Sequence, residues 1–170
     1  VLNLAASGLF LIGLALVYAV TGTLNMTDVA LRVGQLTGDS AVLARAAALL
    51  LLVVFGLKAA LVPLYFWLPG TYASASAPVA ALFAIMTKVG VYSIIRVHWG
   101  IFGAEAGEAA FAAQARLLPL ALTTSVLGVL GALAAHSMGR LVAYLTVSSV
   151  GTILAGVGLY SPETLSASLY

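Results

Sequence analysis

The stretch LLLLVVFGLKAALVPLYFWLP, residues 49–69, decides how this chain folds. It is an almost unbroken apolar run, and a helix needs about 20 such residues to cross a bilayer. Its one charged residue, Lys58, lies near the middle, where placing a lysine costs about 2.5–3.5 kcal/mol. A charge at that depth needs a reason, and the usual reason is an ion or proton path.

A second stretch of the same kind, APVAALFAIMTKVGVYSIIRV, occupies residues 77–97. Lys88 lies near its middle, too deep in a bilayer for its ammonium to reach water easily. Arg96 lies further on, close to the interface, where its guanidinium can reach water or headgroups and anchor the helix. A permanent ion pair between Lys88 and an acid outside this chain is the structural alternative to a transport role.

Pro63 follows Lys58 closely and predicts a break in the first of these helices. Proline lacks an amide hydrogen, and its ring clashes with the carbonyl four residues back, which belongs to Ala59. Gly56, just before the lysine, adds flexibility. Broken transmembrane helices expose carbonyls and helix ends at membrane depth, and they recur in ion sites. A kink that only shapes packing is the alternative.

The composition of the chain places it in a membrane. Of its 170 residues, 63% are hydrophobic and 7% are charged, whereas a soluble domain is about 25% charged. The lack of cysteine excludes disulfides and thiolate metal sites, and no nucleotide motif or basic stripe is present. We therefore expect no cofactor and no nucleic acid partner. The chain starts at Val1 inside an apolar run, which indicates an internal fragment of a longer membrane protein.

Five apolar segments are long enough to span a bilayer as helices. Long continuous runs favour helices over the alternating strands of a barrel. We predict an all-α membrane protein with one transmembrane region over residues 1–170. The predicted spans are about 2–23, 43–68, 78–99, 117–136 and 141–160.

The links between these spans differ in character. Residues 25–38 are mildly amphipathic and predict a short interfacial helix with Thr27 as its N-cap. Residues 69–77, PGTYASASA, indicate a tight uncharged turn. The alanine-rich link before Arg116 predicts another interfacial helix, and the last link, residues 137–140, is short.

No acidic residue falls inside a predicted span; the five acids are Asp28, Asp39, Glu105, Glu108 and Glu163. A carboxylate that pairs with Lys58 or Lys88 at membrane depth must therefore come from elsewhere. Burial lowers the pKa of a lysine and an approaching carboxylate raises it, so a lysine whose partner moves is a switchable proton carrier. We hypothesise that Lys58 and Lys88 relay protons in this way.

Three further residues are candidates for proton uptake or relay: His98, His136 and Ser149. The two histidines end predicted spans, where a pKa of about 6.5 suits proton uptake. The alternative is that they are ordinary interfacial residues, and that Ser149 serves helix packing like its hydroxyl-bearing neighbours. These side chains form no metal-ligand cluster, so we expect no metal site.

The segment FGLKAALVPLYFWLPGTYASASAPVAALFAIMTKVGVYSIIRV, Phe55 to Val97, resembles the D subunit of the Mrp or Pha type of bacterial multisubunit monovalent cation/proton antiporter. That family is related to antiporter-like membrane subunits of respiratory NADH:quinone oxidoreductase and membrane-bound hydrogenases. The shared features are a lysine before a proline and a W-x-P motif, here Lys58, Pro63, Trp67 and Pro69. The segment from Gly139 to Leu159 resembles a later, polar-dotted helix of the same family.

The resemblance implies that this chain is the middle of a fold of about fourteen helices with two inverted repeats, each with a broken helix. Lys58 then matches the channel lysine and Lys88 the connecting lysine, while a partner glutamate and a terminal lysine lie outside residues 1–170. Two departures stand out. Gly70 replaces the acid that commonly follows W-x-P, and residues 136–140 keep only the basic end, Arg140, of the Q-T-D-x-K/R loop of respiratory relatives.

Charge and resemblance disagree on orientation. The positive-inside rule puts the side with four arginines in the cytoplasm, namely Arg32, Arg45, Arg96 and Arg116. The resemblance puts the link with Arg140 there instead, and we prefer it because it rests on a long motif.

The sequence thus favours a proton-translocating subunit of a Na⁺/H⁺ or K⁺/H⁺ antiporter in a bacterial inner membrane, with other hydrophobic subunits as partners. It is a transporter subunit rather than an enzyme. A proton-pumping subunit of a respiratory or hydrogenase complex is the second hypothesis. A scaffold with permanently paired lysines is the third.

Overall fold

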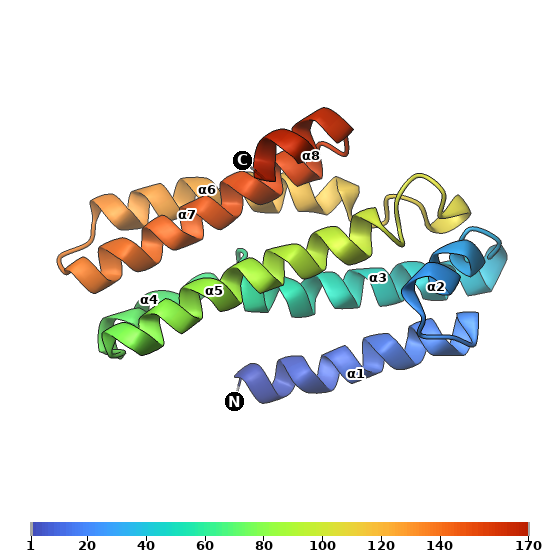
Figure 1. Ribbon diagram of the computed structural model, residues 1–170, viewed down its shortest axis with the longest axis horizontal. Coiled ribbons are helices and arrows are strands. Elements are labelled where there is room, and N and C mark those ends of the chain that lie inside the picture. Colours follow the sequence, from blue (N-terminus) through green and yellow to red (C-terminus); the bar gives the residue numbers. More distant parts are fainter. Residues whose placement is uncertain (1, 170) are drawn as a thin grey trace. The chain divides into compact units, whose positions relative to one another are not determined.

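The computed structural model describes residues 2–169, and every regular element in that part of the chain is a helix (Figure 1). The chain therefore has the all-α architecture that its apolar runs predict. In order, the elements are α1 Leu2–Thr21, α2 Met26–Val33, α3 Gly38–Ala59, η1 Leu64–Phe66, α4 Trp67–Ser74, α5 Ala77–Ile94, η2 Ile95–Trp99, η3 Gly107–Ala109, α6 Gln114–Leu133, α7 Met138–Gly158 and α8 Pro162–Leu169.

Five helical segments of the described chain are long and apolar enough to cross a membrane, which confirms the prediction of five spans. They are Leu2–Thr21, Gly38–Ser74, Ala77–Trp99, Gly107–Leu133 and Met138–Gly158. The second span begins earlier than predicted and is interrupted, because α3 ends at Ala59 and helix resumes only at Leu64. Much of the predicted turn over residues 69–77 is helical and belongs to α4.

The described chain divides into two compact units. Unit 1 holds the residues up to Phe55 together with Ser93–Ala115, and unit 2 holds Gly56–Tyr92 together with the residues from Arg116 on. The three unit boundaries fall within α3, near the end of α5 and in the first turn of α6. The two lysines of the apolar stretches both belong to unit 2.

Unit 1 packs α1, α2 and most of α3 around small and branched apolar side chains, among them Val17, Val29 and Ala47. The predicted helix in the first link is confirmed as α2, but its N-cap is Asn25, whose side chain accepts a hydrogen bond from the Thr27 amide. Arg32 bonds Asp28 at 3.0 Å and donates to the Thr21 carbonyl at 2.9 Å, which ties α2 to the end of α1. The same guanidinium lowers the pKa of the Asp28 carboxyl through this hydrogen bond.

The predicted link over residues 100–116 does not form the interfacial α-helix that its alanines predict. Among the described residues it holds only the short 3-10 helix η3 and turns before α6 begins at Gln114. Its glycines explain the difference. Gly107 has a φ of +55°, and a Cβ at Gly34 would lie 2.5 Å from the Glu105 carbonyl oxygen, so this link folds tightly onto α2. Close backbone packing there replaces helical hydrogen bonding.

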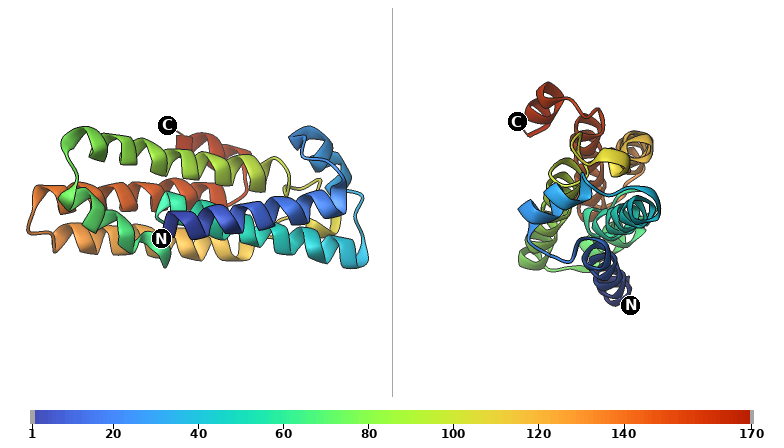
Figure 2. Two further views of the ribbon diagram at one scale, coloured as in Figure 1. Left: turned by 90° about the horizontal axis from the view of Figure 1, so that it is seen from below. Right: turned by 90° about the vertical axis from the view of Figure 1, so that its right-hand side faces the viewer.

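Unit 2 is built from α4, α6, α7, α8 and most of α5, and Figure 2 shows α6 and α7 as a hairpin. The core between α4 and α7 contains Leu68, Tyr72, Ala143 and Val147. Helices α6 and α7 approach closely at Gly128, where a Cβ would lie 2.5 Å from the Ser148 amide nitrogen. Small residues at such crossings let membrane helices gain dispersion contacts over their backbones.

The close approach at Gly128 predicts opposite effects of the same substitution at two helical glycines. Gly128→Ala forces α6 away from α7 and is expected to lower the free energy of unfolding by about 1–3 kcal/mol. Gly8→Ala in α1 is the control, since its Cβ meets no atom within 4 Å. It is expected to be neutral or stabilising by about 0.5–1 kcal/mol, because alanine favours helix over glycine. Thermal melting of the full-length protein in detergent measures both, and equal melting points would contradict the packing at Gly128.

Candidate functional site at the helix break

The helix that carries Lys58 ends through a specific backbone arrangement. Ala60 takes a left-handed conformation with φ +61°. The Leu61 amide donates to the Gly56 carbonyl at 2.8 Å, and the Ala60 amide donates to the Leu57 carbonyl at 3.3 Å. These two bonds define a Schellman C-terminal motif, which usually has glycine in the left-handed position. Alanine there carries a steric cost that the surrounding packing must offset.

Gly56 and Pro63 both serve this break, as the sequence predicts. Leu61 folds back over Gly56, where a Cβ would lie 3.4 Å from the leucine Cδ2. Pro63 precedes η1, so its missing amide hydrogen removes nothing from a helix interior. The chain is therefore non-helical over residues 60–63, which confirms the predicted break near Pro63.

Two side chains form hydrogen bonds with backbone groups at the break. The Trp67 indole Nε1 donates to the Leu57 carbonyl at 2.9 Å. The Val62 amide donates to Thr124 Oγ1 at 3.0 Å, and this buried hydroxyl donates in turn to the Leu120 carbonyl. The W-x-P motif pointed to Trp67 but not to its partner. No sequence signal distinguished Thr124 from its neighbours, because its role depends on α6 lying beside the break.

Lys58 lies in the last turn of α3, and its side chain is half-buried. The C-terminal end of a helix carries about −0.5 of an elementary charge, which favours a nearby cation. The break therefore places Lys58 in the last turn of α3, at the negative end of the helix.

Helix α5 packs against the backbone of this same turn. A Cβ at Gly90 would lie 2.7 Å from the Ala59 amide nitrogen and 3.0 Å from the Lys58 carbonyl carbon. Only a glycine fits at this distance. The turn of α5 that carries Lys88 is consequently held beside the backbone of the turn that carries Lys58.

The structure brings together Lys88 and Ser149, two of the residues singled out from the sequence. The Lys88 ammonium donates to Ser149 Oγ at 2.6 Å, and the Ser149 hydroxyl donates to the Thr146 carbonyl at 2.9 Å. This chain of hydrogen bonds links α5 to α7. Both side chains are exposed within this chain, so they are open to whatever packs against unit 2 in the membrane.

The two histidines occupy different environments. His98 belongs to unit 1 and is completely buried in the π-helical segment η2, at the end of the third span. One ring nitrogen lies 3.1 Å from the Ala48 carbonyl and the other 3.2 Å from the Ile94 carbonyl. His136 is exposed in the link between α6 and α7, as expected of a residue at the end of a span.

Charge is unevenly divided between the units. Unit 2 contains Lys58, Lys88, Arg116 and Arg140 but a single acid, Glu163 on α8. The remaining four acids belong to unit 1. Among the described residues, no group of three or more histidine, aspartate or glutamate side chains could hold a metal ion.

The whole chain, residues 1–170, matches the family described as NADH:quinone oxidoreductase/Mrp antiporter, TM. The chain belongs to this family. It is 45% identical over 168 residues to the D subunit of a probable K⁺/H⁺ antiporter of Rhizobium meliloti, covering 99% of this chain and 31% of that protein. It is 42% identical over 171 residues to the D subunit of a Na⁺/H⁺ antiporter of Bacillus subtilis, covering 100% of this chain and 34% of that protein. The chain thus spans about a third of the curated relatives that it matches.

Two solved structures share the fold of this chain. A chain of the Mrp complex from Dietzia sp. superposes with a TM-score of 0.79 at 34% identity, over 99% of this chain and 30% of that chain. A chain of the membrane-bound sulfane sulfur reductase, an archaeal respiratory membrane complex, superposes with a TM-score of 0.84 at 28% identity, over 99% of this chain and 34% of that chain. The family is a transmembrane one, and this chain is a multi-pass membrane protein.

The hydrogen bond from Val62 to Thr124 predicts how the break responds to mutation. Thr124→Val keeps the shape of the side chain but leaves the Val62 amide without its acceptor, so we expect a loss of about 1–3 kcal/mol in the free energy of unfolding. Thr124→Ser keeps the hydroxyl and is expected to lose less. Thermal melting of the full-length protein compares the two variants. Equal stability of Thr124→Val and the unmodified protein would show that the hydroxyl does not hold the break.

Proposed function

We propose that this chain is part of a membrane subunit of a monovalent cation/proton antiporter that exchanges protons for Na⁺ or K⁺. Its membership of the family and the antiporter names of its relatives support the transport class. The observation that carries the mechanism is the position of Lys58 in the last turn of α3, directly before the break in an apolar span.

In this proposal Lys58 is the switch. A carboxylate that approaches from another helix makes the lysine bind a proton more tightly. When that carboxylate leaves, the lysine releases the proton. Unit 2 contains a single acid, Glu163 on α8, and in this proposal the moving carboxylate comes from another part of the protein or from a neighbouring subunit.

Lys88 and Ser149 continue the path. A hydroxyl can accept a proton from one neighbour while it gives its own to another, so it passes charge without storing it. Ser149 is placed to do this, because its oxygen accepts from Lys88 while its hydrogen is directed at the Thr146 carbonyl. Reorientation of this hydrogen away from Thr146 opens the next step of the relay.

His98 and His136 have different prospects as relay members. His98 is enclosed, and its two carbonyl neighbours suit a structural role that holds η2 to α3. His136 is exposed at the end of a span and is the better candidate for proton uptake. We place the protein in the plasma membrane of a bacterium, with other hydrophobic subunits of an antiporter complex around it, by analogy with the Mrp complex and the Bacillus and Rhizobium relatives.

A proton-pumping subunit of a redox complex is the second candidate. The similarity to a chain of an archaeal respiratory membrane complex favours it. The driving force distinguishes the antiporter from the redox pump. An antiporter exchanges Na⁺ or K⁺ for protons in vesicles without any electron donor, whereas a redox pump moves no protons under that condition.

Two substitutions of Lys58 test the switch. Lys58→Ala removes the titratable group, and Lys58→Arg keeps a positive charge that cannot be released, because arginine stays protonated. We expect both to abolish cation-dependent proton movement in everted vesicles while the complex still assembles. A scaffold role predicts instead that Lys58→Arg retains activity, and near-normal exchange by either variant would refute the relay.

Ser149 and its neighbour Ser148 form a matched pair. Ser149→Ala removes the acceptor of Lys88 and is expected to lower the exchange rate about tenfold or more, within the range by which positioned proton-transfer groups act. Ser148→Ala leaves that contact intact and is expected to be close to normal. Vesicle assays at matched protein levels compare them, and similar rates for the two variants would remove Ser149 from the path.

A further inference from the structure

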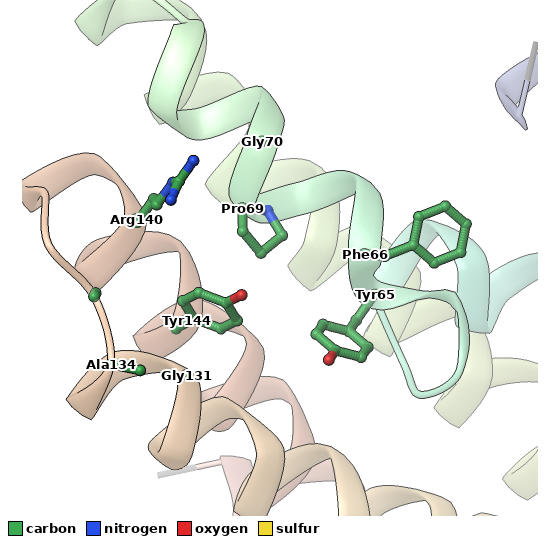
Figure 3. Close-up of a pocket in the computed structure, with 9 residues that line it drawn as sticks. Tyr65, Phe66, Pro69, Gly70, Gly131, Ala134, Arg140 and Tyr144 are labelled. Carbon is green, nitrogen blue, oxygen red and sulfur yellow. The ribbon is translucent and has the colours of Figure 1, made fainter.

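Unit 2 contains an open cavity of about 410 Å³ that the proposed proton path does not use. One wall comes from η1 and α4, with Tyr65, Phe66 and Gly70, and the opposite wall comes from the ends of α6 and α7, with Arg140 and Tyr144. Figure 3 shows the Arg140 guanidinium directed toward Gly70 and the Tyr144 hydroxyl directed into the space between the two walls.

The charge of this cavity comes from Arg140 alone. No acid lines it, and within residues 2–169 the exposed guanidinium has no carboxylate partner. The first turn of α7, which begins at Met138, also brings the positive end of a helix to the same region. The cavity therefore favours an anion, and it disfavours the passage of a metal cation.

The position of the cavity indicates which anion. Residues 134–137 join two spans, α6 and α7, so this end of the hairpin lies at a membrane face. Tyrosine is enriched at such interfaces because its ring is apolar and its hydroxyl is wet. Phe66 lines the cavity and is 60% exposed, which offers an apolar surface beside the cationic one.

We propose that this cavity binds the phosphate of an anionic phospholipid. The guanidinium matches two phosphate oxygens at once, and such charge-assisted pairs are about twice as strong as neutral hydrogen bonds. The Tyr65 and Tyr144 hydroxyls are further donors, and Phe66 and Pro69 contact the glycerol and upper acyl chain. A free phosphate ion can form the same polar contacts as the lipid headgroup, but it has no apolar part that could contact Phe66.

Substitutions at Gly70 test whether the positive charge of Arg140 is what binds the anion. A Cβ at Gly70 meets no atom within 4 Å, so a small side chain fits without displacing the cavity wall. Gly70→Asp places a carboxylate opposite Arg140, where it neutralises the guanidinium from within the chain. Gly70→Asn has nearly the same shape and no charge.

The experiment uses the full-length protein in its complex, purified in detergent and titrated with phosphatidylglycerol, phosphatidylcholine or inorganic phosphate. Thermal melting and the amount of lipid retained by native mass spectrometry are the readouts. We expect phosphatidylglycerol to raise the melting temperature of the unmodified complex more than phosphatidylcholine does, and inorganic phosphate to have little effect. Arg140→Gln and Gly70→Asp should each weaken the response about tenfold or more, while Gly70→Asn and Arg116→Gln retain it.

Each other outcome overturns the proposal. Equal responses to the two lipids would show no anion preference, and a full response to inorganic phosphate would assign the cavity to free phosphate. Loss in Arg116→Gln as large as in Arg140→Gln would indicate unspecific charge attraction. Loss in Gly70→Asn would show a steric effect in place of neutralisation. Because binding is measured without transport, a failure here is distinct from a failure of the proposed antiport.

Discussion

The helix end after Lys58 is the constraint on which the rest of unit 2 depends. The amides of Ala60 and Leu61 turn back onto the last carbonyls of α3, and the chain then leaves the helix for residues 60–63. In a membrane every open backbone group must find a partner inside the protein. Thr124 and Trp67 supply two of these partners, so the break determines which side chains α6 and α4 must carry at this depth.

The break also explains how a bilayer protein keeps two lysines in a unit with a single acid. A helix end offers a diffuse negative potential and a serine offers a hydrogen bond, and neither holds a proton as firmly as a carboxylate. Lys58 lies at the helix end, and Lys88 donates a hydrogen bond to the serine, Ser149. In the proposed relay, both lysines exchange protons with a carboxylate from another part of the protein.

Sequence reasoning succeeded where a single residue type has a strong local effect. Apolar runs predicted five spans, and Pro63 with Gly56 predicted the break. It failed in the links, where Gly107 and Gly34 outweigh the helical preference of alanine by permitting close backbone contact. It also did not predict that His98 is enclosed, because the position of a residue along a span says nothing about the elements that pack around it.

By itself, the sequence determined that this is a membrane protein with five helical spans and with two lysines inside apolar stretches. It also determined that the helix of Lys58 is broken after the lysine. Both results follow because hydropathy and proline chemistry act locally along the chain. Only the tertiary structure decided that Gly90 holds the turn of Lys88 against the backbone of Lys58, that Ser149 accepts from Lys88, and that Arg140 faces Gly70 across a cavity. These pairs are far apart in the chain. Their contacts depend on how closely helices approach, which small residues at the crossings set.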